Sequence, residues 1–292
     1  MRLAIKRTFQ ILLLTLPAVT MASPGEPELR WHWPTFSFWE WMLTGTAAVT
    51  QIVTRAIGPD EQNPTRGTVL LDDRARSALR IDSRQGQRAA RDMTDVMLAI
   101  NTSYPFLVDS LAVAWIYRDS PEVAKQMALI NMEVTVLNTA LESMAKILVS
   151  RQRPFTADCG TEIDPDTKDC YGKGRYTSFF SGHASQTFAA AAATCMHHAY
   201  VPLHGGGAAE MVPCATGMAF AAAAGMGRIM GDMHYWSDVM TGALVGTGVG
   251  LLVPWLHYRE PVREDVLEDG LDGGIGWSVV PYGLGAGVVG TF

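Results

Sequence analysis

The sequence predicts an all-α protein, a helical bundle of about five or six core helices. Long apolar and alanine-rich stretches recur along the 292 residues, of which 48% are hydrophobic and 18% charged. Clusters of glycine, proline and polar residues separate these stretches. The alternation of strands and helices that is typical of a parallel sheet is missing. A chain of this length and composition can bury a substantial core within one large domain.

The first 22 residues have the composition of a secretory signal peptide. Three basic residues precede an apolar stretch over residues 11–21, which is too short to span a bilayer comfortably. Ala22 is a suitable last residue before cleavage. We therefore exclude residues 1–22 from the fold and expect an exported protein. An uncleaved membrane anchor is the alternative.

Residues 23–91 form an N-terminal segment that is first aromatic and then rich in arginine. A helix is expected over residues 39–57, ending near Gly58. The aromatic residues around its start suit either a membrane interface or a packing surface for a terminal segment. They are Trp31, Trp33, Phe36, Phe38, Trp39 and Trp41. The arginines that follow alternate with aspartates, which favours a solvated helix and loop over an approach surface for phosphate or lipid headgroups.

Helical patterns then define a domain over residues 92–257. They cover residues 92–117, 121–149, 181–200, 211–230 and 234–254. Pro105 is expected to bend the first of these helices, and Pro121 suits the first turn of the second. Residues 258–292 begin as an acidic linker and end in a glycine-rich tail. That tail predicts a small β-hairpin, the alternative being a disordered end.

The four cysteines of the chain are expected to form two disulfides. An even number of cysteines in an exported chain favours such pairing. Proximity in sequence favours Cys159 with Cys170 and Cys195 with Cys214, although four cysteines allow three pairings. A zinc site is the competing interpretation, but it lacks a Cys-x-x-Cys spacing.

Two stretches of the chain indicate an anion-binding site. Lys146 and Arg153 lie seven residues apart, about two helical turns, so both are expected on one face near a helix end. Ser181 is a good helix N-cap, and Gly182 beside it lets backbone N–H groups approach an anion closely. His183 then lies in the first helical turn and faces whatever is bound there.

A third stretch supplies a histidine–carboxylate pair. Arg228 ends one helical pattern, a turn with Gly231 follows, and His234 begins the next helix. Asp238 lies four residues after His234, so its carboxylate is expected to hold one ring nitrogen and to leave the other free as a nucleophile. The remaining charged or titratable residues nearby are expected to pack or to lie at the surface. They are Arg151, Asp232, His197, His198, His204 and His257.

Together these stretches resemble the type 2 phosphatidic acid phosphatase superfamily, which includes bacterial class A acid phosphatases, lipid phosphate phosphatases and vanadium haloperoxidases. The family pattern K-x6-R-P, P-S-G-H and S-R-x5-H-x3-D appears here over residues 146–154, 181–183 and 228–238. Phe180 stands where the family has proline, and Gly227 where it has serine. Neither difference removes a charged group, so we expect them to affect loop shape and substrate preference.

The resemblance implies a metal-independent phosphatase without a cofactor. His234 would attack phosphorus, Asp238 would orient it, and His183 would protonate the leaving oxygen. The phosphate oxygens would be held by Lys146, Arg153, Ser181, Gly182 and Arg228. Vanadate is expected to bind as a phosphate mimic. A vanadium-dependent haloperoxidase and a non-catalytic phosphate- or lipid-binding protein are the alternatives.

The net charge of -6 argues against nucleic acid as a partner. A phosphate ester or phospholipid is the expected substrate, and the leaving group and oligomeric state are left open. With a mean hydropathy of +0.10, the chain lies between globular and membrane proteins. We expect a periplasmic or periplasm-facing helical domain with membrane association, the alternative being a multi-pass inner-membrane protein whose site faces the periplasm.

Overall fold

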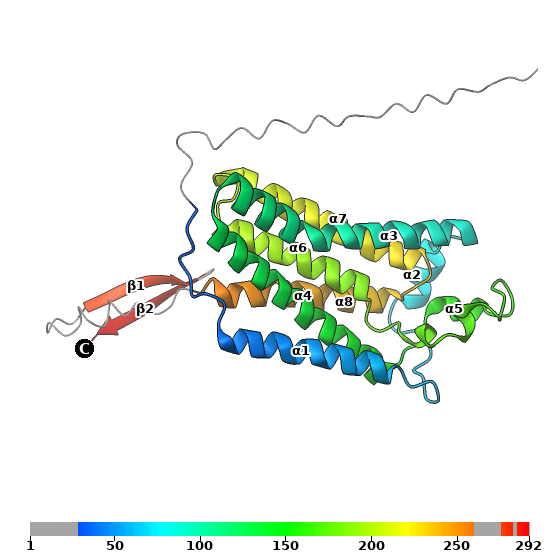
Figure 1. The fold of residues 1–292 in the computed structure, drawn as a ribbon. Helices are drawn as coiled ribbons and strands as arrows, with labels where there is room; N and C mark the ends of the chain where they lie inside the picture. The colour runs from blue at the N-terminus through cyan, green and yellow to red at the C-terminus, as the bar shows by residue number, and fades with distance from the viewer. Residues whose placement is uncertain (1–28, 260–275, 283–284, 292) are drawn as a thin grey trace, which may run out of the picture.

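The described part of the computed structural model comprises residues 29–259, 276–282 and 285–291. Its long helices lie side by side in one bundle, so the all-α fold class is confirmed (Figure 1). The predicted signal peptide and the acidic linker after residue 259 lie outside these ranges. At the C-terminus, β1 and β2 form the expected antiparallel hairpin, with Gly276 opposite Thr291 and Tyr282 opposite Gly285.

Six long helices build the bundle, and short helical segments connect them. The α-helices are α1 (Phe38–Ile57), α2 (Asp72–Leu79), α3 (Arg84–Tyr104), α4 (Pro121–Val149), α5 (Lys168–Tyr171), α6 (Gly182–Tyr200), α7 (Met211–Met230) and α8 (Trp236–His257). A π-helical segment, η1 (Pro105–Tyr117), continues α3, and the 3-10 segments are η2 (Pro154–Asp158), η3 (Lys173–Tyr176) and η4 (Gly207–Glu210). The strands are β1 (Gly276–Tyr282) and β2 (Gly285–Thr291).

The alanine-rich helix α6 lies at the centre of the bundle and packs against α4, α7 and α8. Helix α8 turns Gly242, Gly246 and Gly250 towards it, and a Cβ atom at Gly246 would lie 2.0 Å from the carbonyl oxygen of Ser185. The two backbones can therefore approach closely. This packing brings the N-terminal ends of α6 and α8 together beside the C-terminal ends of α4 and α7 (Figure 1).

Two helix boundaries differ from the prediction. Helix α3 begins at Arg84, inside the segment expected to be solvated, because the Ser83 side chain accepts a hydrogen bond from the N–H of Gly86 and caps it. Helix α8 begins at Trp236 rather than at His234. Tyr235 is its N-cap, and the carboxylate of Asp238 accepts the N–H of Tyr235 at 2.9 Å.

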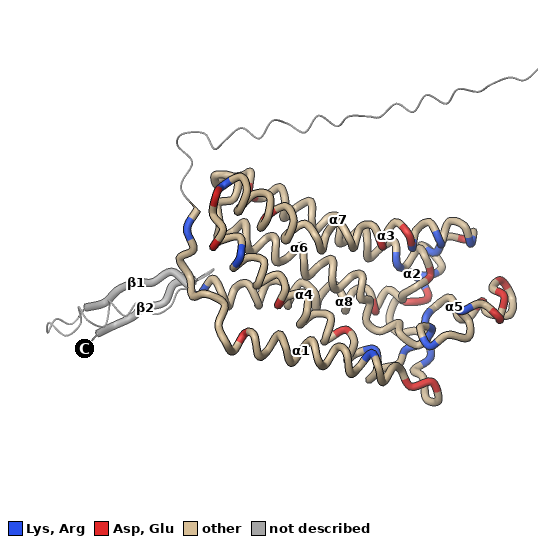
Figure 2. The backbone as a smooth tube through the Cα atoms, viewed as in Figure 1, with Lys and Arg blue, Asp and Glu red and all other residues tan. Residues whose placement is uncertain are grey.

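The arginine-rich segment is a helix and loop as expected, and Arg66, Arg74 and Arg88 are exposed, but its other arginines are bound to the end of the bundle by ion pairs. Arg76 forms a bidentate pair with Asp232, with both N···O distances 2.8 Å. Arg80 reaches Asp158 at 2.7 Å. Charged residues gather at this end of the molecule, around α2 and α5, as Figure 2 shows.

Polar side chains of α4 and the histidines at the far end are buried inside the bundle. His197 contacts the hydroxyl of Tyr258 at 2.6 Å and Asn131 at 2.9 Å. His257 lies 2.7 Å from Glu133. These histidines are therefore packing residues rather than surface groups, and they pair with the buried polar side chains of Asn131 and Glu133 on α4.

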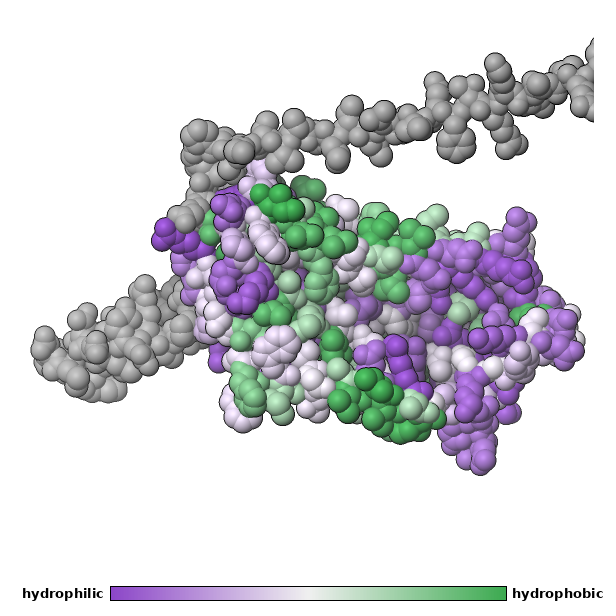
Figure 3. Space-filling model, in the orientation of Figure 1, coloured by the Kyte–Doolittle hydropathy of each residue, from purple (hydrophilic) through white to green (hydrophobic). Residues whose placement is uncertain are grey.

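Some of the aromatic residues near the N-terminus pack against the bundle, and others are exposed. Trp33 meets the ring of Tyr258 edge to face at 4.8 Å, whereas Phe38 and Trp39 are 66% and 77% exposed. Further exposed apolar side chains lie on α1, η1 and α8, and green areas of this kind appear in Figure 3. By length and composition, the stretches Arg84–Tyr117 and Trp236–His257 are apolar enough to cross a membrane.

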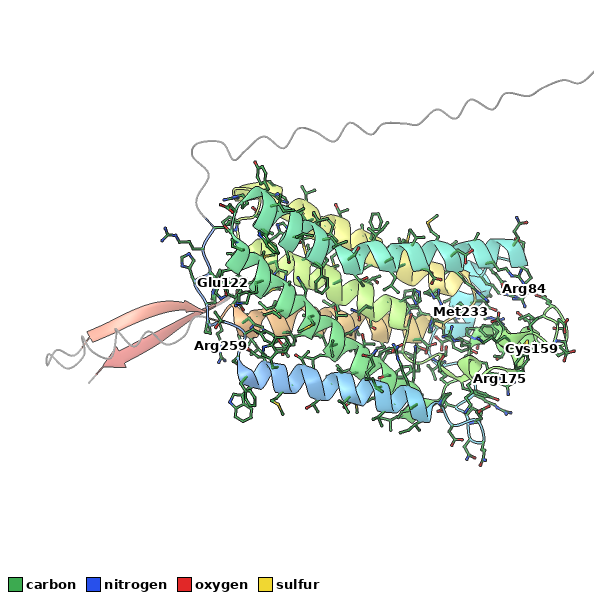
Figure 4. The ribbon with its side chains drawn as sticks, in the orientation of Figure 1. Arg84, Glu122, Cys159, Arg175, Met233 and Arg259 are labelled. Atoms are coloured by element: carbon green, nitrogen blue, oxygen red, sulfur yellow. A yellow bond between two sulfur atoms is a disulfide. The ribbon has the colours of Figure 1, made fainter. Side chains whose placement is uncertain are left out.

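Both expected disulfides are present, Cys159–Cys170 and Cys195–Cys214. The first lies in the loop region near α5, at the end where Figure 4 labels Cys159 and Met233. The second joins the last turns of α6 to the start of α7, at the opposite end of the bundle. The two ends of the molecule are therefore each cross-linked.

Candidate active site

A cavity of about 450 Å³ opens at the end of the bundle where α6 begins and α4 and α7 end. It contains the predicted Lys146, Arg153, Gly182, His183, Arg228 and His234 in its wall. Three stretches that lie far apart in sequence thus meet in one place. The rest of the wall consists of Gln51, Arg55, Leu98, Thr102, Thr135, Asn138, Thr139, Glu142, Ser185 and Gln186.

His234 is held with one ring nitrogen directed away from the cavity. Its Nδ1 lies 2.7 Å from the carbonyl oxygen of Ser178, and since a carbonyl only accepts, Nδ1 must carry the proton. The lone pair is therefore on Nε2. Burial and the charges of Arg153, Arg228 and Lys146 hold the pKa of His234 well below its ordinary value. A neutral imidazole with a fixed tautomer is the form that a nucleophile requires.

The sequence predicted that the Asp238 carboxylate holds a ring nitrogen of His234 by a hydrogen bond, and the structure does not contain this bond. Oδ2 of Asp238 is 4.0 Å from Nδ1 of His234 and accepts the hydroxyl of Ser178 at 2.6 Å instead. Its Oδ1 pairs with Arg151 at 2.5 Å. The backbone carbonyl of Ser178 supplies the orientation, and Asp238 supplies negative charge next to the ring while fixing the Ser178 side chain.

Arg151 and Asp72 were missed by sequence reasoning. Arg151 is 4% exposed and bridges Asp238 to the fully buried Asp72, which lies 2.7 Å from its Nη2. The ring of Tyr235 stacks below the guanidinium at 4.3 Å. Arg151 therefore points away from the cavity, as expected, but it supports the carboxylate behind His234. No local pattern marks Asp72 as its partner, because 79 residues separate the two.

His183 has a carboxylate partner on α3. Its Nε2 lies 2.7 Å from Oδ1 of Asp95, which also lies 3.3 Å from Arg228. Burial and the Arg228 charge lower the pKa of His183 to about 4, and Asp95 opposes that decrease. Asp95 therefore favours the protonated form that can donate to a leaving group.

Three predicted cations, with Arg55 of α1 as a fourth in the wall, give the cavity its positive charge. Lys146 is paired with Glu142 and Arg228 with Asp95, whereas Arg153 has no carboxylate within 4.0 Å among the described residues. Burial lowers the pKa of Arg153 to about 10 and of Arg228 to about 9, so both remain charged at neutral pH. The buried Nε groups of both arginines have no hydrogen-bond partner in the described structure. The site can therefore accept a small polyanion.

The start of α6 completes the cavity. Gly182 is in its wall, and a Cβ atom there would lie 2.4 Å from the Glu142 carboxylate, so a larger residue would displace Glu142 from Lys146. The backbone N–H groups of this first turn add positive potential. Ser181 is fully buried and does not line the cavity, and its hydroxyl caps the helix through the N–H of Ala184. Its contact with phosphate stays a prediction.

In the part of the chain that the structure describes, no group of three or more histidine, cysteine or acidic side chains is arranged to hold a metal ion. The charged groups of the cavity are mostly cationic, so they suit an anion rather than a metal cation.

The PAP2 superfamily matches residues 128–261, from within α4 to just beyond α8. Over this segment, a little under half of the 292 residues, the chain is similar to that superfamily. The similarity points to a phosphatase or phosphoesterase activity. No solved structure gives a significant match to the chain. The matched segment supplies both histidines and the three predicted cations, whereas α1, which adds Arg55, and α3 precede it.

The two departures from the PAP2 motifs are both buried. A Cβ atom at Gly227 would lie 2.4 Å from the methyl group of Thr94, so glycine is what lets α7 approach α3. The hydroxyl of Thr94 accepts a hydrogen bond from Arg228 at 3.0 Å, which fixes the guanidinium of the next residue. Phe180 is 4% exposed and packs at an edge-to-face angle on Phe179. In this protein, helix packing replaces a serine side chain beside Arg228.

Proposed function

We propose that the protein is a metal-independent phosphatase that hydrolyses phosphate monoesters through a phosphohistidine intermediate. The observation that carries this proposal is the arrangement of His234, which donates from Nδ1 to Ser178 and lies in the wall of a cavity with three cations. Phosphoryl transfer requires mainly positioning and charge stabilisation, which these groups supply. Phosphatidic acid-like lipids and small phosphate esters are the two substrate classes.

In the first step, the lone pair on Nε2 of His234 attacks phosphorus and the bond to the leaving oxygen breaks. His183 donates its proton to that oxygen, and Lys146, Arg153 and Arg228 hold the other oxygens. In the second step, His183 takes a proton from water, the hydroxide attacks phosphorus, and the N–P bond breaks. Phosphate leaves and His234 is neutral again. A bound phosphate dianion raises the pKa of His183, so substrate helps to protonate its own acid.

Replacing His234 by alanine tests this mechanism. With an aryl phosphate in EDTA, we expect the wild type to turn over and His234→Ala to lose at least about a hundredfold in kcat, because no covalent intermediate can form. His204→Ala, at the opposite end of α6, is the control and should retain activity. Orthovanadate should inhibit the wild type. Undiminished turnover by His234→Ala would reject the phosphohistidine pathway.

We also propose that the protein is exported and associated with a membrane. Disulfides lie at both ends of the bundle, and such bonds persist in oxidising compartments. Exposed apolar side chains such as Phe38, Trp39 and Leu244 suit contact with lipid. Thiol alkylation of intact cells, before and after reduction, measures this placement. Four cysteines that react without reduction would contradict it.

A further inference from the structure

Among the residues that the structure describes, the wall of the active-site cavity contains a single carboxylate, that of Glu142. Glu142 is 7% exposed and lies on α4, one helical turn before Lys146, with which it forms an ion pair. A pocket that binds phosphate is expected to exclude negative side chains, because like charges at close range repel each other. A carboxylate inside this site therefore weakens the binding of an anion there.

One oxygen of Glu142 lies between two groups that are expected to bind phosphate. Its Oε1 pairs with Nζ of Lys146, and a Cβ atom at Gly182 would lie 2.4 Å from the same oxygen. Gly182 is the first residue of α6, whose first-turn N–H groups carry positive potential. The carboxylate therefore lies between the lysine and the start of α6. A phosphate oxygen that uses both groups requires the same position.

The charge of Glu142 stabilises the protonated forms of two cations of the site. Burial lowers the pKa of Lys146 and that of Arg153, and the Glu142 charge opposes the decrease in both. A bound phosphate dianion would act on these cations in the same way and with twice the charge. Loss of Glu142 would therefore remove a repulsion from the dianion, while the dianion itself would keep Lys146 protonated.

We propose that Glu142 is an internal counter-anion that competes with phosphate for Lys146 and the start of α6. Its carboxylate releases Lys146 when the phosphate group of a substrate binds, and it pairs with Lys146 again when inorganic phosphate leaves. This competition weakens the binding of the product, so the cations that stabilise phosphoryl transfer do not retain phosphate. The inference rests on the proposed phosphatase activity. Glu142 is a positioning residue, because it acts through Lys146.

Glu142→Gln keeps the size of the side chain and removes its charge. With an aryl phosphate as substrate, we expect the inhibition constant of inorganic phosphate to fall at least about tenfold, and KM to fall without a rise in kcat. Glu122→Gln is the matched control, because it removes the charge from an exposed pair with Lys125 on the same helix, and it should keep the wild-type constants. A carboxylate that only fixed Lys146 in place would give the opposite result, weaker phosphate binding.

Calorimetry with inorganic phosphate measures the same effect without turnover. Glu142→Gln should bind phosphate at least about tenfold more tightly than the wild type, and Glu142→Met, which also lacks the charge, repeats the comparison in a second variant. Unchanged or weaker phosphate binding overturns the competition, and the phosphatase proposal then still stands if the aryl phosphate is hydrolysed. If the wild type hydrolyses no phosphate ester, the phosphatase proposal fails, and the calorimetric comparison alone decides the role of Glu142.

Discussion

In the pair formed by His183 and Asp95, the negative charge of Asp95 favours the protonated form of His183, the proposed general acid. The carboxylate of Asp95 is 62% exposed, yet its 2.7 Å contact opposes the burial and the Arg228 charge that lower the pKa of His183. Asp95 lies outside the cavity wall, so it acts through His183 and Arg228 rather than on the substrate. It is a positioning residue.

Replacing Asp95 by asparagine should lower the pKa of His183 further below about 4. The protonated form is the general acid, so the alkaline limb of the kcat/KM profile should move to lower pH. At neutral pH, we expect kcat for an alkyl phosphate to fall at least about tenfold, and less for an aryl phosphate, whose leaving group needs little protonation. Steady-state kinetics across pH provide the measurement.

Asp92→Asn, on the same helix, is the control for this substitution and should leave the profile unchanged. A rise in KM at constant kcat in Asp95→Asn would mean that the carboxylate only arranges Arg228. An unchanged pH profile would show that Asp95 does not influence the acid.

At the scale of elements, the contact between α6 and α8 depends on the glycines of α8. Gly246 faces the carbonyl oxygen of Ser185, whereas the nearby Gly248 has no atom within 4 Å of its missing Cβ position. Because both glycines lie on α8, replacing each by alanine changes helix propensity similarly. Only the replacement at Gly246 also disturbs the close approach of the two backbones.

Gly246→Ala should destabilise the protein by about 1–3 kcal/mol, because the methyl group would force the two backbones apart. Gly248→Ala should be neutral or stabilise by up to about 1 kcal/mol, since alanine favours the helix and meets no neighbour. Denaturant unfolding of both variants measures the difference. Equal stabilities would mean that α6 and α8 do not pack as closely as the structure shows.

At the scale of the whole molecule, buried histidines make stability depend on pH. Burial lowers the pKa of His197 to about 3, and His183 and His234 are also lowered. Between about pH 4 and 6.5, the unfolded chain therefore binds protons that the native protein does not, so stability is lost as pH falls. The pKa of His198 is raised by its contacts with Asp109 and Glu210, which outweigh its burial, so this one histidine opposes the trend at the upper end of the window. The three histidines with lowered pKa values outnumber it.

We expect the free energy of unfolding to decrease between pH 7 and pH 5, by up to about 1.4 kcal/mol per pH unit for each histidine that stays neutral. Chemical denaturation at several pH values measures this slope. His204→Ala should have the same slope as the wild type, because His204 is exposed. A stability that stays constant or rises towards pH 5 would contradict this effect of the buried histidines.

Local signals in the sequence were enough to predict the main helices and the core of the site. Pro121 marks the start of α4, and the spacing from Arg228 to Asp238 places His234 near the start of α8, two residues before its first helical residue. The ion pairs of the arginine-rich segment could not be predicted in this way, since Arg76 and Asp232 are 156 residues apart. Nothing in the local sequence distinguishes Asp95 from Asp92, because only the fold brings one of them to His183.

The ion-pair bridge from Asp72 through Arg151 to Asp238 limits how far the chain can be shortened from its N-terminal side. The matched segment starts at residue 128, yet one of the two carboxylates that neutralise Arg151 comes from α2. A fragment without α2 would leave a buried guanidinium with a single counter-ion, directly behind His234. We therefore expect a fragment that keeps the proposed activity to begin upstream of Asp72, and the matched segment alone to lack part of the support for the site.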